Sequence, residues 1–162
     1  MAMADEKQDL NMVRAIADYQ FGRGVGKALF PDGVKLVYSK RTGRVRHIYL
    51  GESLLATLRP TDGFFSLTLE GARRLMEANG GRRYWVKVCR EASPYVAQGR
   101  SVFAKHVVDV DVGIRPGEEV VVLSEDGSII AVGRALLSGR EMLEFQQGVA
   151  VKVRAGSDRQ SK

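Results

Sequence analysis

Residue types that perform catalysis or bind metal ions are few in this chain. It contains one cysteine and two histidines, and Cys89, His47 and His106 stand apart from one another in the sequence. A cysteine nucleophile needs a neighbouring base, and a metal site needs several converging ligands. The sequence therefore predicts no catalytic residues, no metal site and no cofactor, and we expect a protein that is not an enzyme.

Each reactive side chain also has a structural interpretation. Cys89 falls in an alternating apolar segment, which favours a small buried residue over a nucleophile. His106 would share a strand face with apolar residues, so a packed histidine and a contact to a partner are both open. Asp109 and Asp111 would face the same way and could pair for acid–base chemistry. Two solvated loop carboxylates are the favoured interpretation.

A glycine-rich segment, 22–26, followed by Lys27 invites comparison with a phosphate-binding loop. In such a loop the lysine precedes a serine or threonine, and the first glycine follows a strand. Here Ala28 replaces the hydroxyl residue, Phe21 replaces the first glycine, and no strand is predicted before it. The sequence therefore predicts a flexible connector and no nucleotide site.

Positive charge is in excess and is concentrated in two clusters. The chain has 25 Lys and Arg against 19 Asp and Glu, a formal net charge of +6, which suits an anionic partner such as nucleic acid. The first cluster has only Glu91 within it and comprises Arg82, Arg83, Lys87, Arg90, Arg100 and Lys105. The second has no acidic residue within it, and a solvated surface explains it equally well; it comprises Lys40, Arg41, Arg44 and Arg46.

The segment 99–108 combines a glycine, basic residues and an alternating pattern, which predicts one continuous strand over 101–109. Because Gly99 has no Cβ, it would let the backbone approach a partner, and Arg100 and Lys105 would supply charge for an anionic one. One face of this strand would carry Ser101, Phe103, Lys105 and Val107, and the other Val102, Ala104, His106 and Val108.

The second half of the chain, from about Arg83 to Arg154, resembles a PUA domain, a small RNA-binding barrel of tRNA- and rRNA-modifying enzymes. The resemblance rests on the segments 99–105, 115–120, 131–135 and 148–153. It implies that structured RNA, a tRNA acceptor end or rRNA, is bound by Gly99, Arg100, Ser101, Val102, Phe103, Lys105 and Lys152. The basic residues and Ser101 would contact phosphates or sugars, and the backbone at Val102 and Phe103 would meet terminal bases. Phe103 as a simple core residue is the alternative.

The remaining elements are predicted from periodicity and turn residues. In the first half we expect a helix from Met12 that buries Met12, Ala15, Ile16 and Tyr19, then strands over 34–39, 44–50, 52–58 and 64–67, and a helix over 69–78 capped by Thr68. In the second half we expect a strand over 84–89, a helix over 93–98 and a hairpin of 120–123 with 128–136. A capping box, Ser138–Glu141, then opens a helix with Met142, Leu143 and Phe145 inward, before a last strand over 149–153.

The first half is similar to the small domain that precedes the PUA domain in archaeosine tRNA-guanine transglycosylase. The residues that carry this resemblance are 17–22, 28–31, 54–58 and 62–68. The implied fold class is an α+β N-terminal domain followed by a mainly β, PUA-like pseudo-barrel. The predicted boundaries are a flexible start over 1–11, an α+β domain over 12–81, a PUA domain over 82–155 and a disordered tail over 156–162.

These observations favour a non-catalytic RNA-binding protein that is accessory to RNA modification or ribosome biogenesis. A separate RNA-modifying enzyme subunit is a further expected partner. The alternative is a protein-interaction scaffold whose basic face is incidental. No membrane segment and no signal peptide are predicted, and the single cysteine indicates the reducing cytoplasm.

Overall fold

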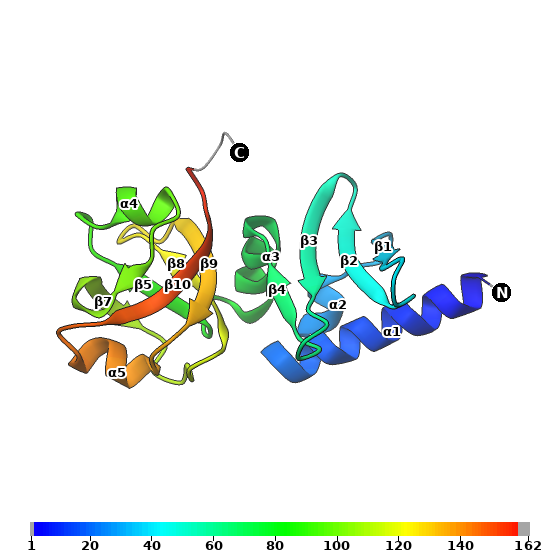
Figure 1. Ribbon diagram of the computed structural model, residues 1–162, viewed down its shortest axis with the longest axis horizontal. Helices are drawn as coiled ribbons and strands as arrows, with labels where there is room; N and C mark the ends of the chain where they lie inside the picture. The colour runs from blue at the N-terminus through cyan, green and yellow to red at the C-terminus, as the bar shows by residue number, and fades with distance from the viewer. Residues whose placement is uncertain (1, 159–162) are drawn as a thin grey trace. The chain divides into compact units, whose positions relative to one another are not determined.

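The chain divides into two compact units in a computed structural model that describes residues 2–158, with side chains from Asp5 onward (Figure 1). The first unit is Met1–Asn79 and the second is Gly80–Lys162. The predicted boundary lay two residues later, within the same glycine-containing segment. Each unit has its own sheet and its own buried core.

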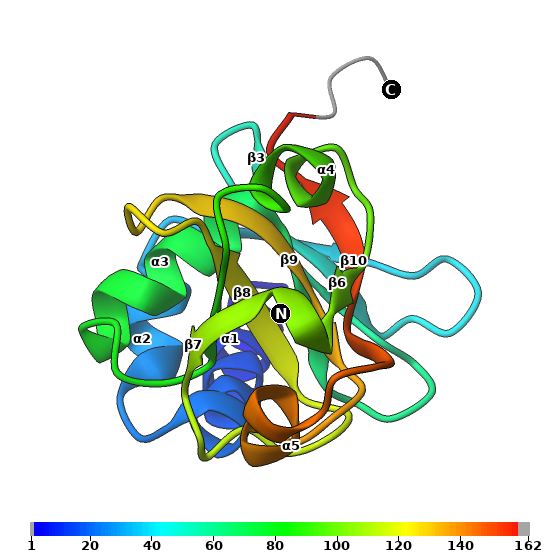
Figure 2. The same cartoon turned by 90° about the vertical axis from the view of Figure 1, so that its left-hand side faces the viewer.

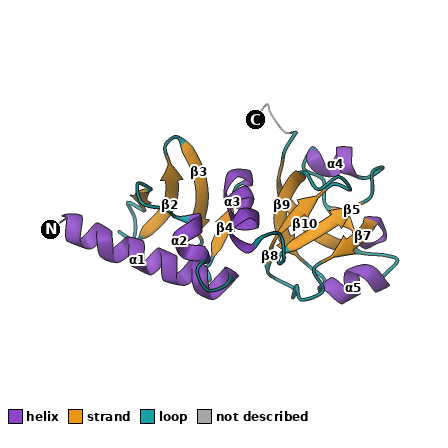
Figure 3. Ribbon diagram, turned by 180° about the vertical axis from the view of Figure 1, so that it is seen from behind, coloured by secondary structure: helices purple, strands orange, loops and turns teal. Residues whose placement is uncertain are grey.

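The first unit combines helices with a four-stranded antiparallel sheet, as the α+β prediction required. Its strands follow one another in a meander, β1-β2-β3-β4. The elements are α1 (Ala2–Phe21), α2 (Val25–Leu29), β1 (Lys35–Tyr38), β2 (Val45–Leu50), β3 (Ser53–Leu58), β4 (Phe65–Leu67) and α3 (Leu69–Asn79), drawn by type in Figure 3. The strand order and the capped helix α3 match the expectation, since Thr68 Oγ1 accepts a hydrogen bond from Gly71 N at 3.1 Å.

Helix α1 begins at Ala2, so the expectation of a flexible segment is wrong for residues 2–11; Met1 lies outside the described residues. The early turns of α1 are tied to the sheet, because Tyr38 Oη donates a 2.6 Å hydrogen bond to Asp9. Burial raises the pKa of Tyr38 to about 12, and the hydrogen bond and negative charge of Asp9 add to this shift. A polar sequence thus forms helix because a tertiary partner holds it.

The buried face of α1 also differs from the predicted one. Val13 and Ala17 are fully buried, whereas Met12 is 41% and Tyr19 is 82% exposed. Two apolar rows run along this helix at the same spacing, and only the packing partner decides which faces the core. The ring of Tyr19 instead stacks on Phe64, with centroids 6.0 Å apart.

The glycine-rich segment after α1 serves helix packing. It leads into helix α2, and a Cβ placed on Gly26 would lie only 2.1 Å from the carbonyl oxygen of Arg14. Gly26 N donates a 2.6 Å hydrogen bond to Asp18 Oδ1. The prediction of a flexible connector is therefore wrong, because glycine is needed here for close contact between α1 and α2.

The second unit is a nearly closed pseudo-barrel, as predicted. Its sheet has the order β6-β10-β9-β8-β5-β7, in which β5 and β8 are parallel. The elements are β5 (Trp85–Val88), α4 (Ser93–Ala97), β6 (Val102–Phe103), the 3₁₀ helix η1 (Ala104–His106), β7 (Val107–Val110), β8 (Glu119–Leu123), β9 (Ile129–Ala135), α5 (Gly139–Glu144) and β10 (Val149–Gly156). Helices α4 and α5 lie at opposite ends of this barrel (Figure 2).

The segment 101–109 does not form the single strand that its alternation predicted. β6 pairs with β10 at one edge of the sheet, η1 interrupts the strand, and β7 pairs with β5 at the other edge. Val102 and Ala104 are buried, while Lys105 is exposed on η1. β6 and β7 lie at opposite edges of the sheet. The backbone therefore turns between them, at the place where the alternation predicted one continuous strand.

Two predictions near the C-terminus are corrected as well. Strand β10 runs to Gly156, and Ser157 N and Asp158 N donate to the carbonyls of Ile130 and Ala97 at 2.9 and 2.8 Å. The predicted disordered tail is therefore wrong for 156–158, and 159–162 lie outside the described residues. In α5 the capping box is confirmed and Met142 is buried, but Leu143 and Phe145 are 50% and 43% exposed.

Asp111 is a structural carboxylate and not the solvated loop residue we expected. Its side chain is 8% exposed and accepts hydrogen bonds from Tyr84 N at 2.7 Å, Gly113 N at 2.9 Å and Arg83 Nε at 3.0 Å. Burial alone would raise the pKa of Asp111, but these hydrogen bonds and the Arg83 charge hold it below its usual value. Tyr84, which has a positive φ of 70°, is thereby fixed at the start of β5.

Replacing Asp111 with Asn should destabilise the protein by about 1.5–3 kcal/mol at pH 7, because hydrogen bonds to a charged acceptor are lost. The pKa of Asp111 is lower in the folded protein than in the unfolded chain, so this stabilisation is complete above the unfolded-state pKa of about 4. It is lost as the pH falls through the pKa of the folded state. Urea titrations at pH 7 and pH 3 measure the difference. An equal difference at both pH values would contradict the assignment.

A fragment covering Gly80–Lys162 should fold alone, because its core and hydrogen bonds lie within its own sheet. We expect one cooperative thermal transition by circular dichroism. A fragment without a transition would show that the barrel depends on the first unit.

Candidate nucleic-acid interface

The turn that leads into β6 is shaped by glycine. Gly99 has a φ of +106°, a conformation that side chains with a Cβ rarely adopt. Its N–H donates to the carbonyl of Val96 at 2.9 Å, and Arg100 N donates to that of Tyr95 at 3.1 Å. Gly99 is therefore required by the turn after α4, whether or not a partner approaches its backbone.

Three basic residues of the predicted site have exposed side chains: Arg100 before β6, Lys105 on η1 and Lys152 on β10. Within the described part of the chain, none of these three side chains has an ion pair or hydrogen bond. Their charges are therefore available to a partner. A surface that combines several uncompensated cations attracts polyanions.

Pairing of β6 with β10 brings Lys152 beside a segment about fifty residues earlier in the sequence. Val151 stands opposite Val102, and both are fully buried inside the barrel. Lys152, the next residue of β10, is exposed and therefore faces outward. The structure thus places Lys152 and the β6 segment on neighbouring strands, as the predicted site requires.

The other predicted site residues divide between core and surface. Val102 has no exposed surface, so only its backbone is left as a contact, and Ser101 is half-buried. Phe103 is 46% exposed, which decides between the core and contact interpretations in favour of the surface. Its ring meets that of His106 edge-on, with centroids 6.2 Å apart.

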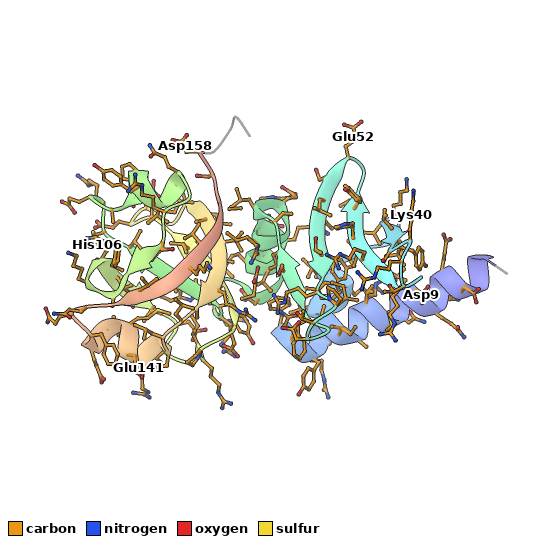
Figure 4. All side chains as sticks on the ribbon, viewed as in Figure 1. Asp9, Lys40, Glu52, His106, Glu141 and Asp158 are labelled. Carbon is orange, nitrogen blue, oxygen red and sulfur yellow. The ribbon has the colours of Figure 1, made fainter. Side chains whose placement is uncertain are left out.

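His106 lies on η1 and is half-buried, so it does not share the buried face of Val102 that a continuous strand implied (Figure 4). Its carbonyl accepts a 2.9 Å hydrogen bond from Cys89 N, which ties η1 to the end of β5. Cys89 is half-buried. Asp109 is exposed and accepts a hydrogen bond from the neighbouring Val110 N at 2.9 Å.

Sequence reasoning missed two basic residues on the same outer face. Arg134 stands directly opposite Lys152 in the β9–β10 ladder, and its Nε donates to Gly117 O at 3.3 Å. Arg154 follows two residues after Lys152 and forms an ion pair with the buried Glu119. Period-two alternation around Lys152 was the available signal, but only strand pairing shows that Arg134 faces it.

The side chains gathered in this region are suited to binding. Among the described residues, no group of three or more His, Cys, Asp or Glu side chains could hold a metal ion. No helix in that part of the chain is long and apolar enough to cross a membrane. The arrangement consists of exposed cations, an exposed aromatic ring and accessible backbone, which suits recognition of an anionic polymer.

Comparison with protein families decides what this barrel is. Residues 84–156 match the model of the PUA domain, and residues 11–80 match the patch-forming domain C2 of tRNA-guanine transglycosylase. The chain consists of this patch-forming domain, which we call the C2 domain, followed by a PUA domain. Both matches agree with the two structural units and with the predicted resemblances.

Curated relatives of this C2–PUA chain include archaeal proteins named tRNA-guanine(15) transglycosylase. The protein of Pyrococcus abyssi is 47% identical over 147 residues, which is 91% of this chain and 25% of the relative. That of Methanobrevibacter smithii is 45% identical over 150 residues, 93% of this chain and 23% of the relative. The chain thus spans about a quarter of the length of these relatives.

Solved structures show the same two-domain fold. A hypothetical protein of the hyperthermophilic archaeon Pyrococcus horikoshii superposes with a TM-score of 0.74 and 27% identity, covering 95% of this chain and 93% of its own. A conserved PUA domain protein from Thermoplasma acidophilum has a TM-score of 0.65 and 22% identity, with coverages of 95% and 91%. The second likeness concerns the fold alone.

Replacing Gly99 with Ala should destabilise the PUA domain by about 1–2 kcal/mol, because a Cβ is strained at this positive φ. Thermal unfolding of the full chain measures the loss. Gly127→Ala, in the turn between β8 and β9 and at a φ of +90°, is a matched control with a similar expected loss. A Gly99→Ala protein as stable as the wild type would contradict this role.

Proposed function

We propose that this protein binds structured RNA through its PUA domain and does not itself catalyse a reaction. The observation that carries the proposal is the set of exposed charges on Arg100, Lys105 and Lys152, which flank β6 on the PUA barrel. Among the described residues these side chains have no ion pair or hydrogen bond. The alignment with tRNA-guanine(15) transglycosylases supports RNA as the anionic partner.

The mechanism follows from the geometry of RNA. An A-form helix hides its deep groove, so proteins contact phosphates, 2′-hydroxyls and unstacked bases near single-stranded ends. The three cations would bind phosphates along the strand. Ser101 and the backbone at Val102 and Phe103 would meet sugar and base edges, and the exposed Phe103 ring offers a surface on which a base can stack.

The role we infer is that of an accessory in RNA modification, with a tRNA acceptor end or rRNA as the bound RNA. The relatives that it aligns with are named as tRNA-modifying enzymes, so a separate RNA-modifying enzyme subunit is the proposed partner. Cytoplasmic localisation follows from that role. Accessory action in ribosome biogenesis is the other role compatible with rRNA binding.

A protein-interaction scaffold is the competing function. Leu143 and Phe145 at α5 are half-exposed, and an exposed apolar pair of this kind suits a protein partner. The two functions predict different effects of salt and of charge removal. A high 260/280 absorbance ratio of the purified protein would indicate co-purified nucleic acid and would also favour RNA binding over the scaffold function.

Replacing Arg100, Lys105 and Lys152 together with Ala should weaken binding to a stem with a single-stranded 3′ end by at least about tenfold and reduce the salt slope of log K by about three. Fluorescence anisotropy over a series of salt concentrations measures both. The control K7A/R23A/K27A removes the same charge from exposed positions of the C2 domain and should bind as the wild type does.

Duplex DNA of equal length should bind more weakly than the RNA, because it lacks 2′-hydroxyls and A-form shape. Equal affinity for both nucleic acids, together with an unchanged R100A/K105A/K152A protein, would reject this function in favour of the scaffold.

A further inference from the structure

The C2 domain carries a second concentrated positive surface, in a pocket of about 470 Å³. Four arginines line it, Arg41, Arg44, Arg46 and Arg59, and we call it the arginine pocket. It is also lined by apolar side chains, those of Val45, Leu58 and Pro60. Nothing in the interface on the PUA domain involves these residues.

Strand topology explains why these arginines meet. In an antiparallel meander, alternate turns lie at the same end of the sheet. The turn between β1 and β2 carries Arg41 and Arg44, and the turn between β3 and β4 begins at Arg59. The intervening β2–β3 turn carries Glu52, and Figure 4 shows it apart from Lys40 on the β1–β2 turn. The turn that carries Glu52 therefore lies at the other end of the sheet from the turn that carries Arg41 and Arg44.

A β-bulge adds the fourth arginine. Val37 pairs with His47 and Tyr38 pairs with Val45, so Arg46 is an extra residue in β2 with no partner of its own on β1. A bulge re-aims the side chains beside it. Here Val45 is only 4% exposed and Arg46 is half-buried, and both line the pocket.

The backbone that carries these charges is held by local hydrogen bonds. Ser39 Oγ accepts from Arg41 N at 3.2 Å and Thr42 N at 3.3 Å, and Thr42 Oγ1 accepts from Arg44 N at 3.2 Å. Ser39 N donates to Arg44 O at 2.8 Å and closes the turn. A turn fixed in this way presents its cations without a large loss of backbone entropy on binding.

Charge pairing separates one arginine from the other three. Arg59 binds Asp62 through two nitrogens, with Nη2 2.9 Å from Oδ2 and Nε 3.1 Å from Oδ1, and also donates to Ser66. Arg41, Arg44 and Arg46 have no ion pair within the described residues. The pocket therefore has three uncompensated guanidinium groups beside one neutralised group.

We propose that the arginine pocket binds backbone phosphates of RNA, as a second contact besides the PUA domain. This inference rests on the proposed function. Guanidinium groups bind phosphate oxygens through paired N–H donors, and arginine is the residue that suits this geometry. Three uncompensated groups spread over an open, partly apolar pocket match successive phosphates and the riboses between them.

The test compares the full-chain variant R41A/R44A/R46A with the same control, K7A/R23A/K27A, on the RNA used above. We expect the pocket variant to bind at least about tenfold more weakly, with a salt slope smaller by about three, and the control to match the wild type. A pocket variant that binds as the control does would overturn the proposal. Thermal unfolding of both variants checks that the fold is intact.

A second variant, R41K/R44K/R46K, separates charge from fold. Lysine keeps the charge but lacks the planar fork, so the salt slope should stay near the wild-type value while affinity falls. A slope as shallow as that of the alanine variant would mean that the substitutions act through the fold, and would overturn the proposal.

The two RNA contacts can fail independently. Weaker binding by R41A/R44A/R46A with R100A/K105A/K152A unchanged would reject the proposed PUA interface and retain the pocket. The reverse result would retain the interface and reject the pocket. Titration with inorganic phosphate, followed by the amide resonances of Gly43 and Arg44, addresses a small anion as ligand. Tight saturation by phosphate that RNA does not displace would also overturn the proposal.

Discussion

Closure of the PUA barrel imposes the constraint on which the second unit depends. β6 and β7 follow each other in the sequence but occupy opposite edges of the six-stranded sheet. The few residues between Val102 and Val110 must therefore cross from one edge to the other, and η1 makes the turn. Both edge strands are short, with two residues in β6 and four in β7, so neither offers a long open edge that could pair with another chain.

The same crossing decides which residues of the segment reach the surface. Val102 and Ala104 fill the core, whereas Phe103 beside β10 and Lys105 on η1 are exposed. Lys152 reaches this region only because β10 is the partner of β6. At the far end of the crossing, Asp111 fastens the end of β7 to Tyr84 at the start of β5. The candidate interface thus lies on β6, on η1 and on the neighbouring strand β10.

Ion pairing distinguishes structural arginines from those available to a ligand. Arg59, Arg83 and Arg154 are each held by a carboxylate, on Asp62, Asp111 and Glu119. Within the described residues, no ion pair holds Arg100, Lys105 or Lys152 on the PUA domain, and none holds Arg41, Arg44 or Arg46 on the C2 domain. Each of these surfaces combines charge with apolar groups: the exposed Phe103 in one, and the half-buried Leu58 with the exposed Pro60 in the other. That combination suits a ligand with both phosphates and planar bases.

The sequence alone determined the element order, the α+β character of the first half and the barrel of the second. Local rules suffice for these features: the Thr68 cap, the Ser138–Glu141 capping box and the strand alternation depend on near neighbours in the chain. The motif resemblances also located Gly99, Arg100 and Lys105, because these residues form one short segment.

Only the tertiary structure decided which side of an ambiguous pattern faces the core. α1 buries Val13 and not Met12, and it extends to Ala2, because Tyr38 and the neighbouring helix select one face and hold its first turns. The break of the strand at η1, the inward turn of Asp111 and the meeting of four arginines in one pocket likewise depend on contacts between residues distant in sequence. Periodicity reports how side chains alternate along one segment, but it carries no information about the partner that the segment will meet.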